Sequence, residues 1–181
     1  MRIISGEWRG RKLVAPKGDL TRPTADRTRE TLFSMLTSRL GSFDELSIAD
    51  LFAGSGALGL EALSRGAASC LFVEQDRSAL DAIRANIAAF EVRDRARVEA
   101  TSVMQLRART EPLDLILLDP PYKTGAGSVA LDRLLRLGWI GEATWMALET
   151  GGTEDVEIKG LTIETQRRVG KGKLTLLRAS A

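Results

Sequence analysis

The chain alternates between short apolar runs and segments with helical spacing, and this alternation limits the possible folds more than any other feature. Runs typical of strands occur at residues 47–52, 70–74, 96–100, 113–118 and 144–149. Helical segments are predicted at 25–40, from the end of the glycine turn 53–59 to residue 65, and at 78–90, 102–109 and 128–138. Strands that alternate with helices form a parallel sheet covered on both faces. Two further runs, 161–169 and 173–178, flank a glycine-containing turn and predict an antiparallel hairpin. The sequence therefore predicts an α/β fold that closes with this hairpin.

The length of 181 residues is typical of one globular domain. Residues 1–24 are basic and contain glycine and proline, so we expect them to form an N-terminal arm, in which 2–5 pairs with 11–14 beside a main domain of residues 25–181. No apolar run is long enough for a membrane span, no signal-peptide pattern is present, and a single cysteine is typical of a reducing compartment. We therefore expect a cytoplasmic protein without membrane contact, and we favour a monomer.

The residue types that are missing exclude several kinds of catalytic site. The sequence contains no histidine, which excludes Ser-His-Asp and Cys-His catalysis and histidine metal sites. One cysteine cannot form a cysteine-cluster zinc site. We expect no bound metal.

Basic residues gather at the two ends of the chain, although the formal net charge is only +2. Residues 1–30 carry a net charge of +4 and residues 159–181 one of +5, which leaves −7 for the residues between them. Two cationic ends that fold onto one side are typical of a nucleic-acid-binding protein. Solvated surface charge is the simpler alternative, and the charge distribution alone leaves both open.

A glycine turn follows the first predicted strand of the parallel set. In open parallel sheets, ligands bind at the carboxyl ends of the strands, beside this turn, and an acidic residue at the end of the next strand accepts hydrogen bonds from ribose hydroxyls. We therefore predict a nucleoside-containing cofactor held by Asp50, Phe52, Ala53, Gly54, Ser55, Gly56, Glu74 and Gln75. Residues 54–59 also fit the dinucleotide pattern G-x-G-x-x-G, so a nicotinamide dehydrogenase is a competing interpretation.

The tetrapeptide Asp119-Pro120-Pro121-Tyr122 follows the apolar run 113–118 and separates these two interpretations. Asp119 and the Pro120 carbonyl can accept the two N–H bonds of an exocyclic amine, so that the nitrogen lone pair faces an electrophilic methyl group. Proline makes this segment rigid, and Tyr122 can stack on the base. The four residues together resemble the catalytic motif of amino-methyltransferases that use S-adenosylmethionine.

The chain as a whole resembles the bacterial 16S ribosomal RNA guanine-N2 methyltransferase family, which modifies guanine 966 of the small subunit. The resemblance rests on residues 1–13, 22–33, 50–65 and 119–122. It implies a Rossmann-like class I methyltransferase with a seven-stranded, mostly parallel sheet, S-adenosylmethionine as cofactor, and ribosomal RNA, free or in a 30S particle, as substrate.

The resemblance also implies roles for residues outside the two motifs. Glu30 and Ser102 would contact the cofactor, although members of the family usually carry Asn or Asp where Ser102 stands. Tyr122 takes the place of a frequent phenylalanine, and tyrosine is also common in adenine-N6 enzymes. Contacts with RNA are expected from Arg9, Arg11, Arg22, Thr24, Arg27 and Lys171.

Three other functions stay open at this point. An adenine-N6 methyltransferase of DNA uses the same chemistry, although 181 residues leave little room for a separate recognition domain. A dehydrogenase fits the glycine turn but leaves Asp119–Tyr122 without a role. A non-catalytic RNA-binding module would not need Asp119.

Overall fold

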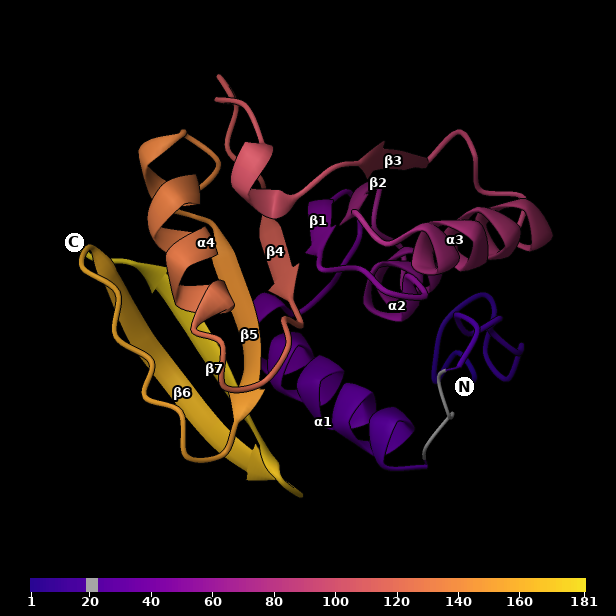
Figure 1. Ribbon diagram of the computed structural model, residues 1–181, viewed down its shortest axis with the longest axis horizontal. Helices are drawn as coiled ribbons and strands as arrows, with labels where there is room; N and C mark the ends of the chain where they lie inside the picture. The colour runs from indigo at the N-terminus through magenta and orange to yellow at the C-terminus, as the bar shows by residue number, and fades with distance from the viewer. Residues whose placement is uncertain (19–22) are drawn as a thin grey trace.

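The computed structural model describes residues 1–18 and 23–181, which form a mixed seven-stranded sheet with helices on both faces (Figure 1). The strand order is β3-β2-β1-β4-β5-β7-β6. The strands are β1 (Ser47–Leu51), β2 (Ser69–Glu74), β3 (Ala96–Ala100), β4 (Leu115–Leu118), β5 (Trp145–Gly151), β6 (Leu161–Val169) and β7 (Gly172–Ala179). The helices are α1 (Pro23–Leu40), α2 (Ala57–Ser64), α3 (Arg77–Ala89) and α4 (Ala126–Arg136). The seven-stranded α/β sheet expected from the sequence is confirmed.

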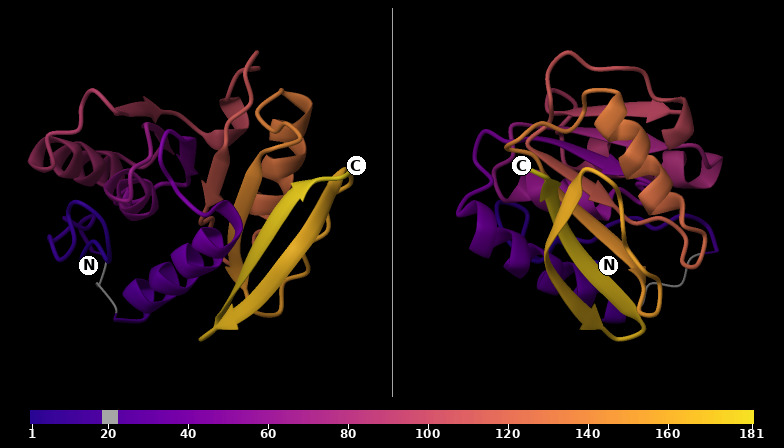
Figure 2. Two further views of the ribbon diagram at one scale, coloured as in Figure 1. Left: turned by 180° about the vertical axis from the view of Figure 1, so that it is seen from behind. Right: turned by 90° about the vertical axis from the view of Figure 1, so that its left-hand side faces the viewer.

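Strands β1 to β5 are parallel, and β7 pairs with them in the antiparallel direction. β1 lies between β2 and β4, so the chain reverses its winding direction there. Such a reversal leaves a crevice at the carboxyl ends of the strands. The predicted hairpin is confirmed as β6 and β7, which form the edge of the sheet beside β5 (Figure 2).

Alternating side chains of each strand pack into two separate cores. On β4, Leu115 and Leu117 face the core under α1, α2 and α3, whereas Ile116 and Leu118 face the core under α4. All four side chains are at most 1% exposed, which is expected for central parallel strands that are buried on both faces. This alternation also decides which residues beyond the strand ends share a face.

The helix predicted at 102–109 is wrong. Only a 3₁₀ turn, Val103–Gln105, is present in that segment. The residues after it bond to the segment that follows α4: the Arg109 N–H donates to Leu137 O at 2.8 Å, and the Trp139 Nε1–H donates to Arg107 O at 2.7 Å. These tertiary hydrogen bonds use backbone groups that a longer helix would have satisfied internally.

Residues 1–18 lie against α2 and α3 and form part of the first core. Arg2 and Lys12 form one antiparallel bridge, which is less than the two-stranded pairing of 2–5 with 11–14 that we expected. The side chains of Ile3, Trp8 and Leu13 are nonetheless buried. The ring centroids of Trp8 and Phe90 are 5.0 Å apart, so this tryptophan attaches the segment to the domain.

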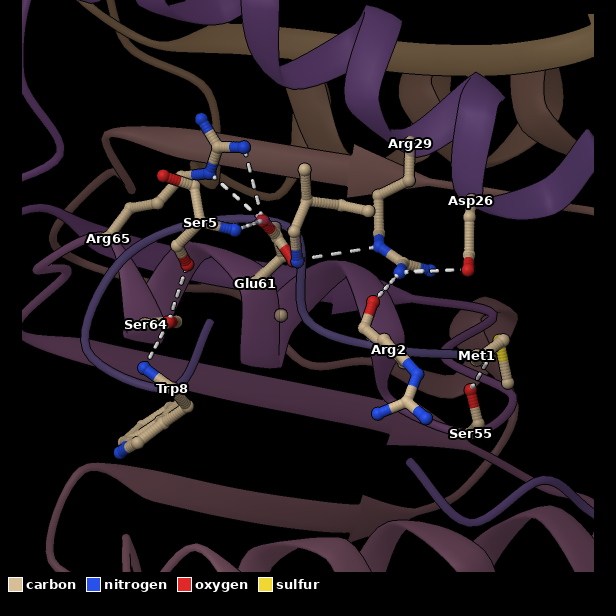
Figure 3. Close-up of polar contacts among 12 residues, drawn as sticks. Met1, Arg2, Ser5, Trp8, Asp26, Arg29, Ser55, Glu61, Ser64 and Arg65 are labelled. Atoms are coloured by element: carbon tan, nitrogen blue, oxygen red, sulfur yellow. Dashed lines mark hydrogen bonds and ion pairs between the residues drawn. The ribbon is translucent and has the colours of Figure 1, made fainter. Parts of the chain in front are cut away.

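A polar cluster on α2 anchors the same segment (Figure 3). The Glu61 carboxylate is fully buried and accepts hydrogen bonds from the N–H groups of Ile4 and Ser5, at 2.9 and 3.0 Å. Arg65, at 3.1 Å, and Arg29, at 3.6 Å, balance its charge. The start of the chain is therefore fixed to the helix that follows the glycine turn.

Candidate active site

A cleft of about 1150 Å³ opens at the carboxyl ends of β1, β4 and β5. Its walls come from the glycine turn after β1, the segment after β4, the first turns of α1 and the β6–β7 hairpin. Met1 and Ala15 also line it, so residues 1–18 complete one wall. The motifs that the sequence analysis singled out therefore meet in one cavity.

The glycine turn leaves β1 in a conformation that is uncommon for residues other than glycine. Phe52 has a φ of 59° and Gly56, which precedes α2, a φ of 82°. The turn is fixed by the Ala53 N–H, which donates to Val73 O at 3.1 Å, and by the Gly54 N–H, which donates to Glu74 Oε1 at 2.9 Å. Phe52 and Gly54 line the cleft in this fixed arrangement.

Glu74 ends β2, as predicted, and its carboxylate is already engaged with the backbone. Besides the Gly54 N–H, it accepts hydrogen bonds from the N–H groups of Gln75 and Asp76, each at 2.8 Å. Carboxylate oxygens have about four acceptor sites in total, so capacity for a further donor remains. Glu74 thus shapes the glycine turn directly.

Asp50 lies beneath the turn and is only 1% exposed. One of its oxygens accepts a hydrogen bond from the Gly59 N–H at 2.9 Å, whereas Oδ1 is buried and has no partner among the described residues. Desolvation raises the pKa of Asp50 to about 8, against the opposing effect of the Gly59 hydrogen bond, and the Glu74 charge adds to the increase. Asp50 is also among the residues that line the cleft.

Asp119 stands directly after β4, next to the end of β1. Leu118 pairs with Leu51 in the parallel register, and the Asp119 N–H reaches Leu51 O at 3.5 Å. Asp119 is exposed to solvent, and it lines the cleft. Desolvation among the surrounding protein atoms, followed by the nearby Glu149 carboxylate, raises the pKa of Asp119 well above its usual range.

Tyr122 is held by its hydroxyl group. The phenol donates a hydrogen bond to Glu149 Oε1 at 2.6 Å, while the side chain is 42% exposed along the cleft. Desolvation and this hydrogen bond raise the pKa of the Tyr122 phenol above its ordinary value. The ring therefore has a fixed position and an accessible surface, as a stacking platform requires.

Basic side chains from separate parts of the chain line the outer walls. Arg27 comes from α1, Lys123 follows the tetrapeptide 119–122, and Arg168 and Lys171 belong to the hairpin. All four residues are exposed. The cleft is thus lined both by carboxyl groups and by exposed cations.

Nine of the predicted site residues line this cleft. Those in the cleft are Asp50, Phe52, Ala53, Gly54, Ser55, Asp119, Tyr122, Arg27 and Lys171. Not among the lining residues are Gly56, Glu74, Gln75, Ser102, Glu30, Pro120, Pro121, Arg9 and Arg11. Arg22 and the side chain of Thr24 lie outside the described residues.

Two of the predicted residues outside the cleft have other partners. Arg11 donates to Ala89 O at 2.8 Å and lies over the Phe90 ring at 4.3 Å, so its guanidinium packs on the end of α3. The Ser102 hydroxyl accepts a hydrogen bond from the Met104 N–H at 3.2 Å and caps the 3₁₀ turn. Both contacts are local to the protein.

Sequence reasoning missed Glu149, Arg168, Lys123 and Met1. Glu149 had a usable signal, because it lies in the fifth predicted strand, and side chains near the carboxyl ends of parallel strands share an edge. The other three reach the cleft only through the packing of the hairpin, the loop and the N-terminal segment. Within residues 1–18 and 23–181, no group of three or more His, Cys, Asp or Glu residues could hold a metal, and no helix could cross a membrane.

Comparison with known proteins assigns the family. The family model described as "Conserved hypothetical protein 95" matches residues 1–178. Ribosomal RNA small subunit methyltransferase D of Escherichia coli is 37% identical over 150 residues, which are 83% of this chain and 74% of that protein. The chain belongs to this methyltransferase family. The Haemophilus influenzae member is 34% identical over 154 residues, covering 83% of this chain and 78% of the relative.

Solved structures agree with membership of the methyltransferase D family. An Escherichia coli structure described as a candidate methyltransferase, YhhF, has a TM-score of 0.84 and 34% identity, covering 100% of this chain and 98% of that one. Magnesium protoporphyrin IX methyltransferase from Synechocystis, solved with bound S-adenosylmethionine, shares the fold with a TM-score of 0.66 at 12% identity, over 90% of this chain and 87% of that one. Family and fold make the chain a methyltransferase and decide against the dehydrogenase.

Proposed function

We propose that this protein transfers a methyl group from S-adenosylmethionine to the exocyclic N2 amine of a guanine in 16S ribosomal RNA, at position 966. The observation that carries the proposal is the meeting of Asp119 with the glycine turn in one cleft. The names of the relatives support ribosomal RNA as the substrate. The cationic mouth of the cleft supports an anionic polymer.

The chemistry of the cleft fits S-adenosylmethionine. This cofactor carries a sulfonium and an ammonium group, and the inner cleft offers the carboxyl groups of Asp50, Asp119 and Glu149. The unpartnered buried oxygen of Asp50 is an acceptor of the kind that an ammonium or hydroxyl donor requires. The turn from Phe52 to Ser55 would hold the nucleoside side of the molecule. When bound, the cofactor supplies an electrophilic methyl group.

The residues after β4 orient the target amine. Asp119 and the Pro120 carbonyl accept its two N–H bonds, which directs the lone pair of the nitrogen toward the cofactor site. Tyr122 stacks on the base, which must be unpaired or flipped out of its helix to enter. The Tyr122–Glu149 hydrogen bond fixes the ring before the base arrives.

The outer cations hold the RNA around the target nucleotide. Arg27, Lys123, Arg168 and Lys171 surround the cleft and would contact phosphates on both sides of the flipped base. The RNA is presented free or within a 30S particle. Ribosomal RNA as substrate also places the protein in the bacterial cytoplasm.

The test is transfer of a labelled methyl group from S-adenosylmethionine to small ribosomal subunits that lack the modification, followed by nucleoside analysis. We expect N2-methylguanosine at a single position. Duplex DNA is the parallel substrate, and labelled N6-methyladenine in DNA alone would replace the proposal with the adenine-N6 alternative. Binding of the cofactor and of RNA without single-turnover transfer would indicate a non-catalytic module.

A further inference from the structure

Asp119 and Glu149 occupy equivalent positions on neighbouring strands. Leu118 of β4 pairs with Leu148 of β5, so the next residue on each strand is Asp119 and Glu149, respectively. Neighbouring strands are about 4.8 Å apart. Side chains two residues apart on a strand point to the same face. Asp119 is therefore on the same face as Leu117, and Glu149 on the same face as Ala147. Leu117 and Ala147 both belong to the first core. The backbone thus places two carboxyl groups side by side on one face, at the edge where the cleft lies.

Tyr122 connects to this pair of carboxyl groups. Its hydroxyl donates to Glu149 Oε1 at 2.6 Å, and both residues line the cleft with Asp119. Gly172, at the start of β7, leaves room for this contact, because a Cβ there would overlap the Tyr122 hydroxyl and come within 3.4 Å of Glu149 Oε1. Three segments that are distant in sequence therefore converge on the Glu149 side chain.

We propose that Glu149 is a positioning residue of the methyl transfer assigned above, on which this inference rests. It fixes the Tyr122 ring through the phenol and forms with Asp119 a carboxyl pair that takes up the proton released by the target amine. An isolated aspartate, with an ordinary pKa of about 3.9, is a weak base for this task. A second carboxylate beside it makes it a stronger base.

The electrostatics of the site agree with this role. Desolvation and then Glu149 raise the pKa of Asp119, and Asp50 contributes in the same direction. The other charged side chains that line the cleft are Arg27 and the buried, ion-paired Arg29 from α1, Lys123 after β4, and Arg168 and Lys171 from the hairpin. The negative charge of Glu154, which follows β5, also raises the pKa of Tyr122. Lys173 of β7 is a positive charge close to Glu154.

The proton balance of the step is complete with these residues. The amine nitrogen forms a bond to the methyl carbon as the bond from that carbon to sulfur breaks, and the sulfonium becomes a neutral thioether. The nitrogen then holds one proton too many. This proton passes to Asp119 within the carboxyl pair and leaves to water when the product departs.

The first experiment uses the phenol as a probe and needs neither cofactor nor RNA. Tyr122 is the single tyrosine in the chain, so ultraviolet difference absorbance follows this one phenolate as the pH is raised. We expect the Tyr122 phenol of the wild type to ionise well above the ordinary tyrosine pKa of about 10. Glu149→Gln should shift the transition to lower pH. Glu142→Gln, an exposed glutamate ahead of β5, is the matched control and should match the wild type.

The second experiment measures the pH dependence of single-turnover methyl transfer with saturating cofactor. The carboxyl pair must be able to take a proton, so the wild-type rate should fall on the acid side as the pair becomes protonated. In Glu149→Gln we expect the maximal rate to fall by no more than about tenfold. The acid limb of the profile should move to lower pH by about one unit. Tyr122→Phe keeps the ring and should reduce the rate without moving the acid limb.

The outcomes separate this inference from the proposed function. An active wild type whose acid limb stays in place in Glu149→Gln, or a phenol transition that this variant leaves unchanged, overturns the role of Glu149 alone. A wild type that methylates neither ribosomal RNA nor small subunits overturns the proposed function and this inference together. Thermal unfolding of each variant verifies that it is folded.

Discussion

The side-chain amide of Asn86 on α3 donates a hydrogen bond of 2.9 Å to the carbonyl oxygen of Ser55 in the glycine turn. The same side chain accepts a hydrogen bond from the Val14 N–H at 2.8 Å and donates one to Val14 O at 3.0 Å. Asn86 is 1% exposed. One buried amide thus joins the N-terminal segment to the turn that lines the cofactor cleft.

Replacing Asn86 with alanine should therefore affect both stability and cofactor binding. Three backbone groups of Val14 and Ser55 lose their partner, and we expect the free energy of unfolding to fall by about 1–3 kcal/mol. Affinity for S-adenosylhomocysteine, measured by calorimetry, should fall because the turn loses one support. Asn86→Asp keeps an acceptor for the Val14 N–H but turns a buried carboxylate oxygen toward the carbonyl oxygens of Val14 and Ser55, so it should cost at least as much as the alanine. Unchanged affinity in Asn86→Ala would separate the N-terminal segment from the cofactor site.

Glu61→Gln tests the buried cluster that anchors residues 1–18. The substitution keeps the size of the side chain but leaves Arg65 without its counter-charge and Arg29 with Asp26 alone, and breaking such a buried pair typically costs about 3 kcal/mol. Urea unfolding measures this loss. Glu142→Gln, on the exposed surface, should stay within about 0.5 kcal/mol of the wild type. Equal effects of the two substitutions would contradict the anchoring role of Glu61.

Asp119→Ala should abolish methyl transfer while cofactor affinity is retained, because the carboxylate is assigned to the target amine. We expect the rate of transfer to fall by about 100-fold or more. Single-turnover transfer and calorimetry with S-adenosylhomocysteine measure the two properties separately. Asp132→Asn, an exposed carboxylate on α4, serves as the control. Loss of cofactor affinity in Asp119→Ala would assign the carboxylate to the cofactor.

The hairpin cations and the N-terminal arginines can be compared by their effect on RNA binding. Arg168→Gln combined with Lys171→Gln should weaken binding and reduce the slope of log K against log salt by about 0.7–0.9 for each phosphate that the variant no longer neutralises. Arg9→Gln combined with Arg11→Gln should change the slope less, because neither residue lines the cleft. An equal reduction in both double variants would show that the RNA also follows the N-terminal segment.

Asp50 predicts a pH dependence of stability with a definite sign. Its pKa is about 8 in the folded chain and about 3.9 when unfolded, so between these values the folded chain binds the additional proton. Wild-type stability should therefore fall as the pH rises through this range, by at most about 1.4 kcal/mol per pH unit.

Asp50→Asn has no carboxyl group to titrate and provides the comparison. Between about pH 4 and about pH 8, the unfolding free energy of the wild type should fall relative to that of the variant as the pH rises. Urea unfolding at several pH values measures it. A difference that does not change with pH would mean that Asp50 titrates normally in the folded chain.

Local sequence patterns were sufficient to predict the sheet and the position of its ligand cleft. Strand periodicity, the glycine turn and the acidic residue that ends the second strand are such patterns, and parallel α/β topology restricts how these elements can be arranged. The motif Asp119–Tyr122 was placed beside the turn for the same reason, and the structure pairs Leu118 with Leu51 as that requires. The strands and the turn were predictable because each depends on residues that are close together in the chain, whereas the placement of Asp119 beside the turn followed from the restricted parallel topology.

Which other side chains reach the cleft depends on long-range packing, and no sequence pattern indicated it for most of them. Glu149, Arg168 and Met1 arrive there from β5, the hairpin and the N-terminus, through contacts between segments that are far apart in sequence. Arg11 has the positive charge expected of a residue that contacts RNA, yet its guanidinium donates a hydrogen bond to Ala89 O. A side chain's type shows what it can bind, but its partner depends on the direction in which the folded backbone points it, and that direction is set by long-range contacts.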